Sequence, residues 1–201
     1  YKPTAGQVLL EGQQIAGLAS HRIARKGLVR TFQNVRLFRQ LTVVENLLVA
    51  QHRKVKTGLL PGLFATPAYR RAEQQALERA ALWLDRMGLR DLANREAGTL
   101  SYGHQRRLEI ARCMITEPRL LMLDEPAAGL NPQEKIDLQH LIDQLRREFG
   151  VAVLLIEHDM SLVMGVSDRI LVMEQGRPIM TGRPDEVRSD PRVIKAYLGE
   201  A

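Results

Sequence analysis

Two carboxylates stand side by side in the middle of the chain, directly after a short apolar run. Residues 120–123 read Leu-Leu-Met-Leu and are followed by Asp124 and Glu125, a pattern typical of a buried strand that ends in charge. Because a buried charge without a partner is costly, this arrangement indicates a metal ion, a water molecule to be activated, or both. The stretch 100–126 is therefore the first candidate for a functional site.

A capped helix and a second apolar strand follow these carboxylates. Asn131, Pro132 and Glu134 predict the start of the helix, with a cap, a first-turn proline and a capping box, and Gly150 predicts its end. Residues 151–156 then predict a buried strand. A strand, a helix and a strand in this order form a right-handed crossover between parallel neighbours.

Such a crossover would bring a histidine close to the carboxylates. His158 lies two residues after the second strand, whereas Asp124 and Glu125 directly end the first one. Open α/β sheets bind their ligands at the carboxyl ends of parallel strands. We therefore expect these three side chains at one edge of one sheet.

The rest of the chain reads as short strands and helices. Thr42 and Glu45 predict a capping box, and Ser20 is a suitable N-cap for a shorter helix. The other predicted elements are strands at 7–10 and 28–32, helices at 20–26, 42–51 and 70–87, a hairpin of 169–173 with 178–180, and two short helices near residues 185 and 193. Residues 58–69 carry no charge and predict an apolar loop, which could pack on its own subdomain or dock on a partner.

The composition is that of a globular protein with a basic surface. The 201 residues suit one domain, alone or with an inserted subdomain, and the 4% aromatic content makes stacked bases or an aromatic ligand cage unexpected. The net charge of +6 suits nucleic acid, acidic lipids or nucleotide phosphates, but also an ordinary solvated face. Cys113, the single cysteine, excludes an internal disulfide and predicts a buried, unreactive thiol. The longest apolar run, 151–156, is far shorter than the roughly 20 residues of a membrane span.

Five short motifs, in one order along the chain, resemble those of the ATP-binding cassette (ABC) ATPases. They are the Q-loop at Gln33, the signature motif L-S-Y-G-H-Q at 100–105, the Walker B strand L-L-M-L-D-E-P at 120–126, the D-loop at 128–131 and the switch histidine at His158. The signature differs from the common form at Tyr102, where glycine is more frequent. Longer phrases, such as R-T-F-Q-N-V-R-L-F and D-E-P-A-A-G-L-N-P, are similar to the ATP-binding subunits of bacterial branched-chain amino-acid importers.

The resemblance implies an α/β fold with two parts. The first is a P-loop NTPase-like (RecA-like) core with a mostly parallel sheet, formed by residues 1–33 and 116–201 and incomplete at its N-terminus. The second is an inserted α-helical subdomain, residues 34–115, which ends in the helix of the signature motif.

The resemblance also implies roles for nine residues, with ATP and Mg²⁺ as cofactors. Glu125 would polarise the attacking water and His158 would hydrogen-bond the γ-phosphate, so these two are the catalytic candidates. Asp124 and Gln33 are the candidates for holding Mg²⁺. The candidates for binding ATP are Gln33, Ser101, Tyr102, Gly103, Gln105 and Asn131.

The signature residues have a physical reason to bind phosphate. Ser101 and Gly103 precede a predicted helix, so a hydroxyl and backbone N–H groups would face outward at the positive end of the helix dipole. In the ABC family this end grips the nucleotide that is held by the opposite cassette.

The resemblance implies an assembly at the cytoplasmic face of the bacterial inner membrane. The partners would be a second ABC ATPase subunit or a second copy of this chain, two transmembrane permease subunits and, indirectly, a periplasmic solute-binding protein, with no nucleic acid. The ATP-binding subunits of amide and urea importers share many of these sequence motifs, so an amide or urea remains an alternative solute. A non-transport ABC ATPase acting on nucleic acid or ribosomes is disfavoured, because only 68 positions, without heptads, separate Gln33 from Ser101 and one cassette is present. A nucleotide-free scaffold is the third alternative.

One element of the family pattern is missing. The sequence contains no G-x-x-x-x-G-K-[ST] and no Gly-Lys dipeptide, whereas this loop cradles the β- and γ-phosphates in P-loop NTPases. In the family the loop would end just before Tyr1. We therefore expect that the N-terminal part is absent from this sequence and that residues 1–201 alone do not hydrolyse ATP.

Overall fold

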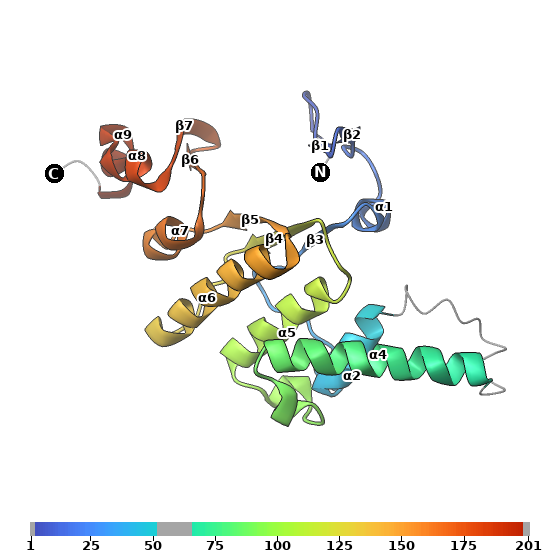
Figure 1. The fold of residues 1–201 in the computed structure, drawn as a ribbon. Coiled ribbons are helices and arrows are strands. Elements are labelled where there is room, and N and C mark those ends of the chain that lie inside the picture. Colours follow the sequence, from blue (N-terminus) through green and yellow to red (C-terminus); the bar gives the residue numbers. More distant parts are fainter. Residues whose placement is uncertain (1–2, 52–65, 199–201) are drawn as a thin grey trace.

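A three-stranded parallel sheet lies at the centre of the molecule (Figure 1). The computed structural model describes residues 3–51 and 66–198. Strand β4 (Leu120–Asp124) is the middle strand, and it pairs in parallel with β3 (Leu28–Arg30) on one side and with β5 (Ala152–Ile156) on the other. The register places Asp124 opposite Ile156, which confirms that the carboxylates and the residues after β5 lie at one edge of one sheet.

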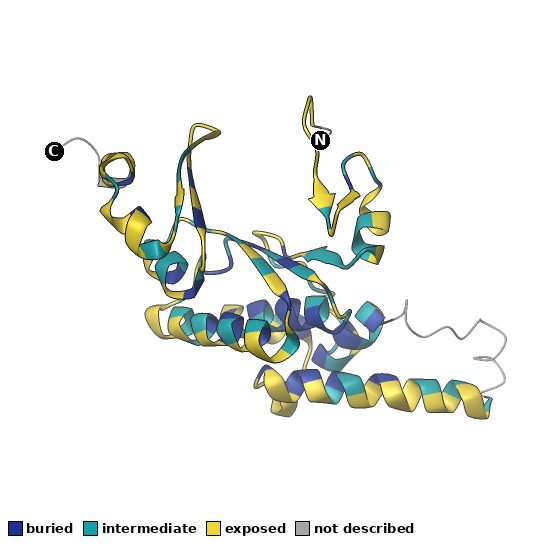
Figure 2. Cartoon of the chain, turned by 45° about the horizontal axis from the view of Figure 1, so that its top comes forward, coloured by how far each residue is buried: buried dark blue, intermediate teal, exposed yellow. Residues whose placement is uncertain are grey.

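Two helices cover one face of this sheet. Helix α5 (Tyr102–Met114) and helix α6 (Pro132–Phe149) lie on the same side of the strands (Figure 1). Leu121 and Leu123 of β4 are fully buried and belong to the same cluster as Leu108 of α5 and Ile142 of α6. Figure 2 shows the buried residues gathered between the sheet and these helices. The apolar side of each helix therefore packs against the sheet.

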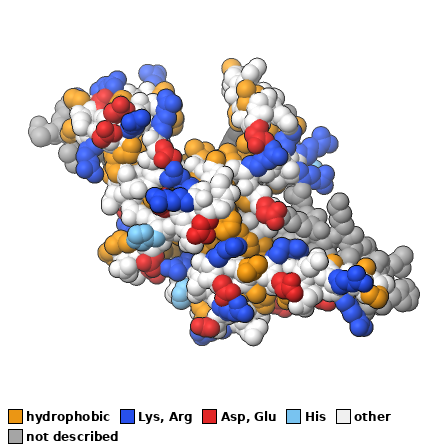
Figure 3. Space-filling view, viewed as in Figure 1, with side chains coloured by type: hydrophobic (Ala, Val, Ile, Leu, Met, Phe, Trp, Pro, Cys, Tyr) orange, Lys and Arg blue, Asp and Glu red, His pale blue; other side chains and the backbone are white. Residues whose placement is uncertain are grey.

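The opposite face of β5 is exposed, which corrects the prediction of a fully buried strand at 151–156. Leu154 and Ile156 are 47% and 48% exposed, whereas Val153 and Leu155 pack against the core. Figure 3 shows hydrophobic side chains in the hollow between the N-terminal and C-terminal projections. A continuous apolar run predicts cover on both faces, but the described residues supply helices for one face only.

The helical part contains α2 (Val43–Gln51), α4 (Pro67–Arg86) and the 3₁₀ turns η1 (Arg90–Leu92) and η2 (Ala97–Thr99). The predicted capping box is confirmed, because Glu45 accepts from the Thr42 backbone N–H at 2.7 Å and Thr42 Oγ1 accepts from Glu45 N at 3.3 Å. Val43 and Leu84 share the core cluster of the sheet. The division at residues 34 and 115 stays a prediction.

Helix α4 begins earlier than predicted. Thr66 is its N-cap and Pro67 its first residue, so the segment up to Tyr69 is not loop; proline at the first helical position needs no N–H partner. The remainder of the predicted apolar loop, 58–65, lies outside the described residues. The predicted buried face of α4 is confirmed at Ala76, Ala80 and Leu84.

The two ends of the described chain form small additions to the sheet. β1 (Leu9–Leu10) and β2 (Gln13–Gln14) pair as a hairpin, followed by α1 (Ser20–Arg25). The N-cap of α1 is Ala19 rather than Ser20, and no side chain caps this helix. At the other end lie α7 (Met160–Val166), the predicted hairpin of β6 (Ile170–Glu174) with β7 (Arg177–Gly182), α8 (Pro184–Ser189) and α9 (Pro191–Leu198), around a second core of Ile170, Val172, Val187 and Val193.

Two predictions from the composition can be compared with this fold. Burial raises the pKa of the Cys113 thiol to about 12, which agrees with an unreactive cysteine because the thiolate is the reactive form. Among residues 3–51 and 66–198, no helix combines the length and apolarity that a membrane crossing requires.

Candidate nucleotide site

Asp124 ends β4, and it contacts Arg30 through its carboxylate and Thr31 through its backbone N–H. The Arg30 Nη2 atom lies 2.5 Å from Asp124 Oδ2, and the Asp124 backbone N–H donates to Thr31 Oγ1 at 3.3 Å. The Asp124 side chain is 19% exposed. A carboxylate at the rim of the sheet is thus neutralised by a cation, as burial requires; the sequence reasoning did not foresee the role of Arg30.

Glu125 and Gln33 contact each other, which the sequence analysis did not predict. Gln33 Nε2 donates to Glu125 Oε2 at 2.8 Å, although 92 residues separate them. The Glu125 backbone N–H donates to the Ile156 carbonyl at 2.8 Å, and its φ of 44° is unusual for a residue other than glycine. Backbone conformations of this kind cluster at functional sites, where the surrounding structure holds them in place.

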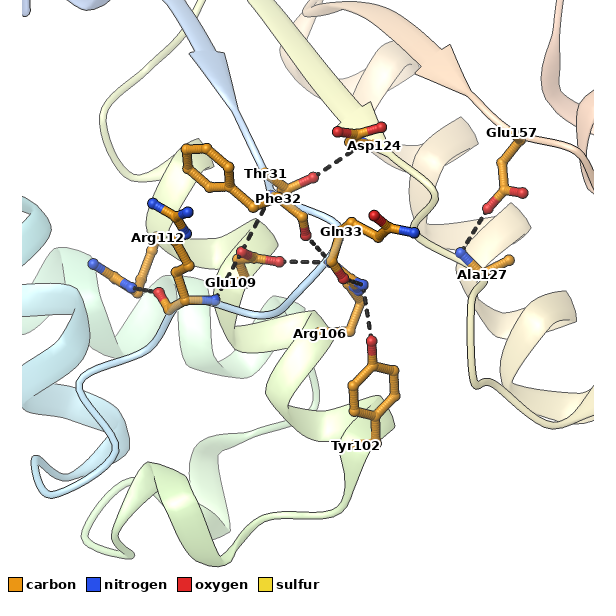
Figure 4. Close-up of polar contacts among 11 residues, drawn as sticks. Thr31, Phe32, Gln33, Tyr102, Arg106, Glu109, Arg112, Asp124, Ala127 and Glu157 are labelled. Carbon is orange, nitrogen blue, oxygen red and sulfur yellow. Dashed lines mark hydrogen bonds and ion pairs between the residues drawn. The ribbon is translucent and has the colours of Figure 1, made fainter.

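His158 lies on the loop after β5, at the same edge of the sheet, and its side chain is 73% exposed. Glu157, its neighbour, is only 1% exposed and accepts hydrogen bonds from Ala127 N at 2.8 Å and from His158 N at 3.0 Å. Figure 4 shows Glu157 reaching across to Ala127. Glu157 therefore joins the loop after β4 to the loop that carries His158, a role that the sequence alone did not reveal.

The predicted signature residues lie at the N-terminus of α5. Ser101 is the N-cap, and its Oγ accepts from His104 N at 3.4 Å. Gln105 Nε2 donates to the Leu100 carbonyl at 2.9 Å. The Tyr102 side chain turns back along α5, where its hydroxyl accepts from Arg106 Nη2 at 3.0 Å. Figure 4 shows Tyr102 on the far side of Arg106 from Asp124.

The D-loop position packs against this helix end. Asn131 caps α6 in the predicted capping box, with both bonds to Glu134 at 2.9 Å. The buried Gly103 faces Glu134, since a Cβ atom on Gly103 would lie 2.5 Å from Glu134 Oε1. A Cβ on Gly129 would likewise lie 3.3 Å from the Tyr102 ring. The signature and D-loop positions are therefore neighbours, which their spacing in the sequence does not predict.

Comparison with known proteins identifies the family. The family model described as ABC transporter matches residues 1–128, and the one described as branched-chain amino acid ATP-binding cassette transporter matches residues 177–201. The branched-chain amino acid transport ATP-binding protein BraF of Pseudomonas aeruginosa is 64% identical over 201 residues, which are all of this chain and 79% of the relative. The chain belongs to the ABC transporter family, among its branched-chain amino acid ATP-binding proteins.

Other comparisons agree with this family. The LivG protein of Escherichia coli K12 is 61% identical over the same 201 residues, again 79% of the relative's length. A crystal structure of an ABC transporter ATP-binding cassette in its ADP conformation matches with a TM-score of 0.81 and 32% identity, covering 100% of this chain and 79% of that one. The predicted fold, an α/β ABC ATPase core with a parallel sheet, is confirmed.

In this ABC transporter subunit the donors at the sheet edge suit a small hard cation. Mg²⁺ prefers oxygen ligands and is usually bound by one or two carboxylates together with phosphate and water. The Asp124 carboxylate and the Gln33 amide, which lies against Glu125, supply oxygen atoms of this kind. No group of three or more His, Cys, Asp or Glu side chains that could hold a metal forms within the described part of the chain.

Asp159 provides a test of how the loop after β5 is held. Its Oδ2 pairs with Lys135 Nζ at 2.6 Å, while its Oδ1 caps α7 through Ser161 N and Leu162 N. The Lys135 hydrogen bond, with the capping N–H groups, holds the pKa of Asp159 below its usual 3.8. A lowered carboxyl pKa stabilises the folded state above the unfolded pKa, and this stabilisation is lost as the pH falls.

We therefore expect Asp159→Asn, which keeps the cap, to be less stable than the wild type at pH 7 by about 0.2–1 kcal/mol, the range of a partly exposed ion pair. The difference should begin to shrink as the pH falls below about 3.8 and should vanish once the pH has passed the lower pKa of the folded state. Urea unfolding followed by circular dichroism at pH 7, 5 and 3 would measure it, with Lys135→Met as the matched variant. Equal pH dependence in Asp159→Asn and wild type would contradict this assignment.

Proposed function

We propose that the full-length protein hydrolyses MgATP to energise the uptake of branched-chain amino acids. The observation that carries the proposal is the pairing of Gln33 with Glu125 beside Asp124, in a chain that is 64% identical to a branched-chain amino acid transport ATP-binding protein over its whole length. Phosphoryl transfer to water needs positioning and charge neutralisation rather than covalent chemistry, and these residue types serve both purposes.

Each residue at the sheet edge has a proposed part. Glu125 would accept a proton from the attacking water, which is typically worth roughly 10²–10⁴ in rate. Gln33 would orient Glu125 through the 2.8 Å hydrogen bond. It would also couple the state of the nucleotide site to the position of the helical part. Asp124 would hold magnesium in exchange for Arg30, and His158 would donate to the γ-phosphate from its exposed loop. When bound, magnesium would neutralise charge on the transferring phosphate.

The second group of residues would act on a partner's nucleotide. Ser101, Gly103 and Gln105 lie at or near the N-terminus of α5, where backbone N–H groups and the helix dipole favour phosphate. Tyr102 and Asn131 would shape the same surface, since Gly129 of the D-loop packs on the Tyr102 ring. The partner would be a second cassette subunit or a second copy of this chain.

The assembly would lie at the cytoplasmic face of the bacterial inner membrane. Two permease subunits would contact the cassettes, with residues near Gln33 as the proposed contact on this chain, and a periplasmic binding protein would supply the solute. Support comes from the relatives, which are named as transport ATP-binding proteins.

Reconstitution would test the proposal. The full-length protein, with its permeases and binding protein in liposomes, should take up labelled leucine, isoleucine and valine only when ATP is enclosed on the cassette side. Uptake of urea or short amides in preference to leucine would replace the proposed solute. ATPase activity stimulated by nucleic acid but not by the loaded binding protein would contradict a transport function.

A further inference from the structure

A buried ion pair on α5 grips the backbone that leads to Gln33. Arg106 and Glu109 are 1% and 5% exposed and lie 2.7 Å apart. Arg106 Nη1 donates to the Phe32 carbonyl and Nη2 to the Gln33 carbonyl, both at 2.9 Å. Tyr102, Arg106 and Glu109 are spaced i, i+4 and i+7, so their side chains share one face of the helix. Figure 4 shows these side chains converging on the segment of Phe32 and Gln33.

The segment after β3 is attached mainly through these side chains. Strand β3 ends at Arg30. The last backbone hydrogen bond to β4 is made by Thr31, whose N–H donates to the Met122 carbonyl. Beyond it, Glu109 Oε1 accepts from Phe32 N at 3.4 Å and from Arg36 N at 3.2 Å. The Arg36 carbonyl accepts from Arg112, also on α5. Backbone groups need partners when they leave a sheet, and here α5 provides five of them.

Burying the charges of Arg106 and Glu109 costs desolvation free energy, which indicates that the pair serves to position the segment of Phe32 and Gln33. Arg106 and Glu109 lie among the buried residues Leu108, Ile110 and Ala111, where apolar side chains would fill the core without desolvating two charges. Instead, the fixed fork of the Arg106 guanidinium donates to the carbonyls of Phe32 and Gln33. The side chain that departs from Gln33 is the one that contacts Glu125 at 2.8 Å.

We propose that Arg106 and Glu109, braced by the Tyr102 hydroxyl, are positioning residues that hold the Gln33 amide on Glu125 and tie it to the signature helix. The proposal rests on the function proposed above. Because Tyr102 also packs against Gly129, a movement of the N-terminus of α5 is passed to Gln33 through one rigid side-chain cluster. Neither residue touches substrate; both act through the backbone at 32–33.

The first experiment measures catalysis in the full-length protein with its permeases. Arg106→Lys keeps the charge but loses the fork, and Glu109→Gln keeps the shape but loses the charge. Since a misplacement of about 1 Å can cost about 10²-fold in rate, we expect kcat to fall about 10- to 100-fold while the KM for ATP changes less than about threefold. Arg107→Gln is the matched control, because Arg107 lies on the same helix but pairs with Asp137 on α6. Unchanged kcat in both test variants would overturn the proposal.

A double-mutant cycle separates positioning from general damage. If Arg106 acts through the Gln33 amide, then Arg106→Lys should reduce kcat little further once Gln33→Ala is present. Equal losses in the two backgrounds would show that Arg106 does not act through Gln33. Tyr102→Phe removes only the hydroxyl and supplies a milder variant should Arg106→Lys fold poorly; it should lower kcat about threefold to tenfold by the same misplacement, and unchanged kcat would count against the brace.

Hydrogen exchange tests the grip without relying on hydrolysis. The amides of Phe32 and Arg36 should exchange about tenfold faster or more in Glu109→Leu, which removes the acceptor, while those of α4 keep their rates, because local opening is confined to the segment that loses its partner. Unchanged exchange at both amides would overturn the grip itself. If the wild type showed slow exchange at these amides but no ATP hydrolysis, the proposed function would fail while the grip stood.

Discussion

Replacing Glu125 with glutamine should nearly abolish ATP hydrolysis by the full-length protein with its permeases, while ATP still binds. The amide has almost the shape of the carboxylate and can accept the hydrogen bond from Gln33 Nε2, which now spans 2.8 Å, but it cannot accept a proton from water. We expect kcat to fall by roughly 10²–10⁴, the usual contribution of a positioned base, with the Kd for ATP changed less than about threefold.

Phosphate release and equilibrium ATP binding would be measured on the same preparation. Glu148→Gln is the matched control, since Glu148 lies near the end of α6 and contacts Gln144, away from the sheet edge. Turnover of Glu125→Gln close to that of the wild type would exclude Glu125 as the base and would leave Asp124 or a water network to be examined.

The second large effect is expected at the signature serine. Ser101→Arg should prevent ATP-dependent pairing of cassettes, because a long cation would occupy the helix end that is proposed to receive the partner's phosphate. Binding of ATP to the single cassette should change little, as Ser101 lies at the start of α5 rather than at the end of β4. Pairing would be measured by analytical ultracentrifugation, with and without ATP, of proteins that also carry Glu125→Gln to prevent hydrolysis.

The loss of a helix cap must be separated from the loss of the interface. Ser101 Oγ caps α5 through His104 N at 3.4 Å, and Thr66 Oγ1 caps α4 through Tyr69 N at 3.3 Å. Thr66→Arg therefore removes an equivalent cap, worth about 1 kcal/mol, at the start of a different helix. An ATP-dependent dimer that forms equally in Ser101→Arg and Thr66→Arg would refute the role of the signature.

Local signals in the sequence predicted local structure well. The boxes at Thr42 and Asn131 were predictable because cap and partner are three residues apart, and the order of apolar runs predicted a parallel sheet that the register of β4 with β5 confirms. Residue types also marked Asp124 and Glu125, since two carboxylates after an apolar run have few structural uses, whereas Gln33 was implied by the resemblance to the ABC family. The catalytic roles of these residues stay predictions.

Contacts that join distant segments were not predictable in the same way. The sequence shows Arg106 only as one of several arginines in a helix. Its contact with the Phe32 carbonyl, 74 residues away, depends on the fold. Arg30 meets Asp124 across 94 residues. A weak signal existed for Arg106 and Glu109: two opposite charges at i, i+3 spacing interrupt the apolar face that the helix turns toward the core.

The contact between Gly103 and Glu134 limits how such cassettes can exchange parts. Glu134 closes the capping box of α6 and fills the space that any side chain at position 103 would need. In a chimera that takes residues 101–114 from one cassette and 127–149 from another, the two sides of this contact come from different proteins. This packing is preserved when glycine at position 103 and the capping acid at position 134 arrive together, which a single exchanged segment from 101 to 149 ensures.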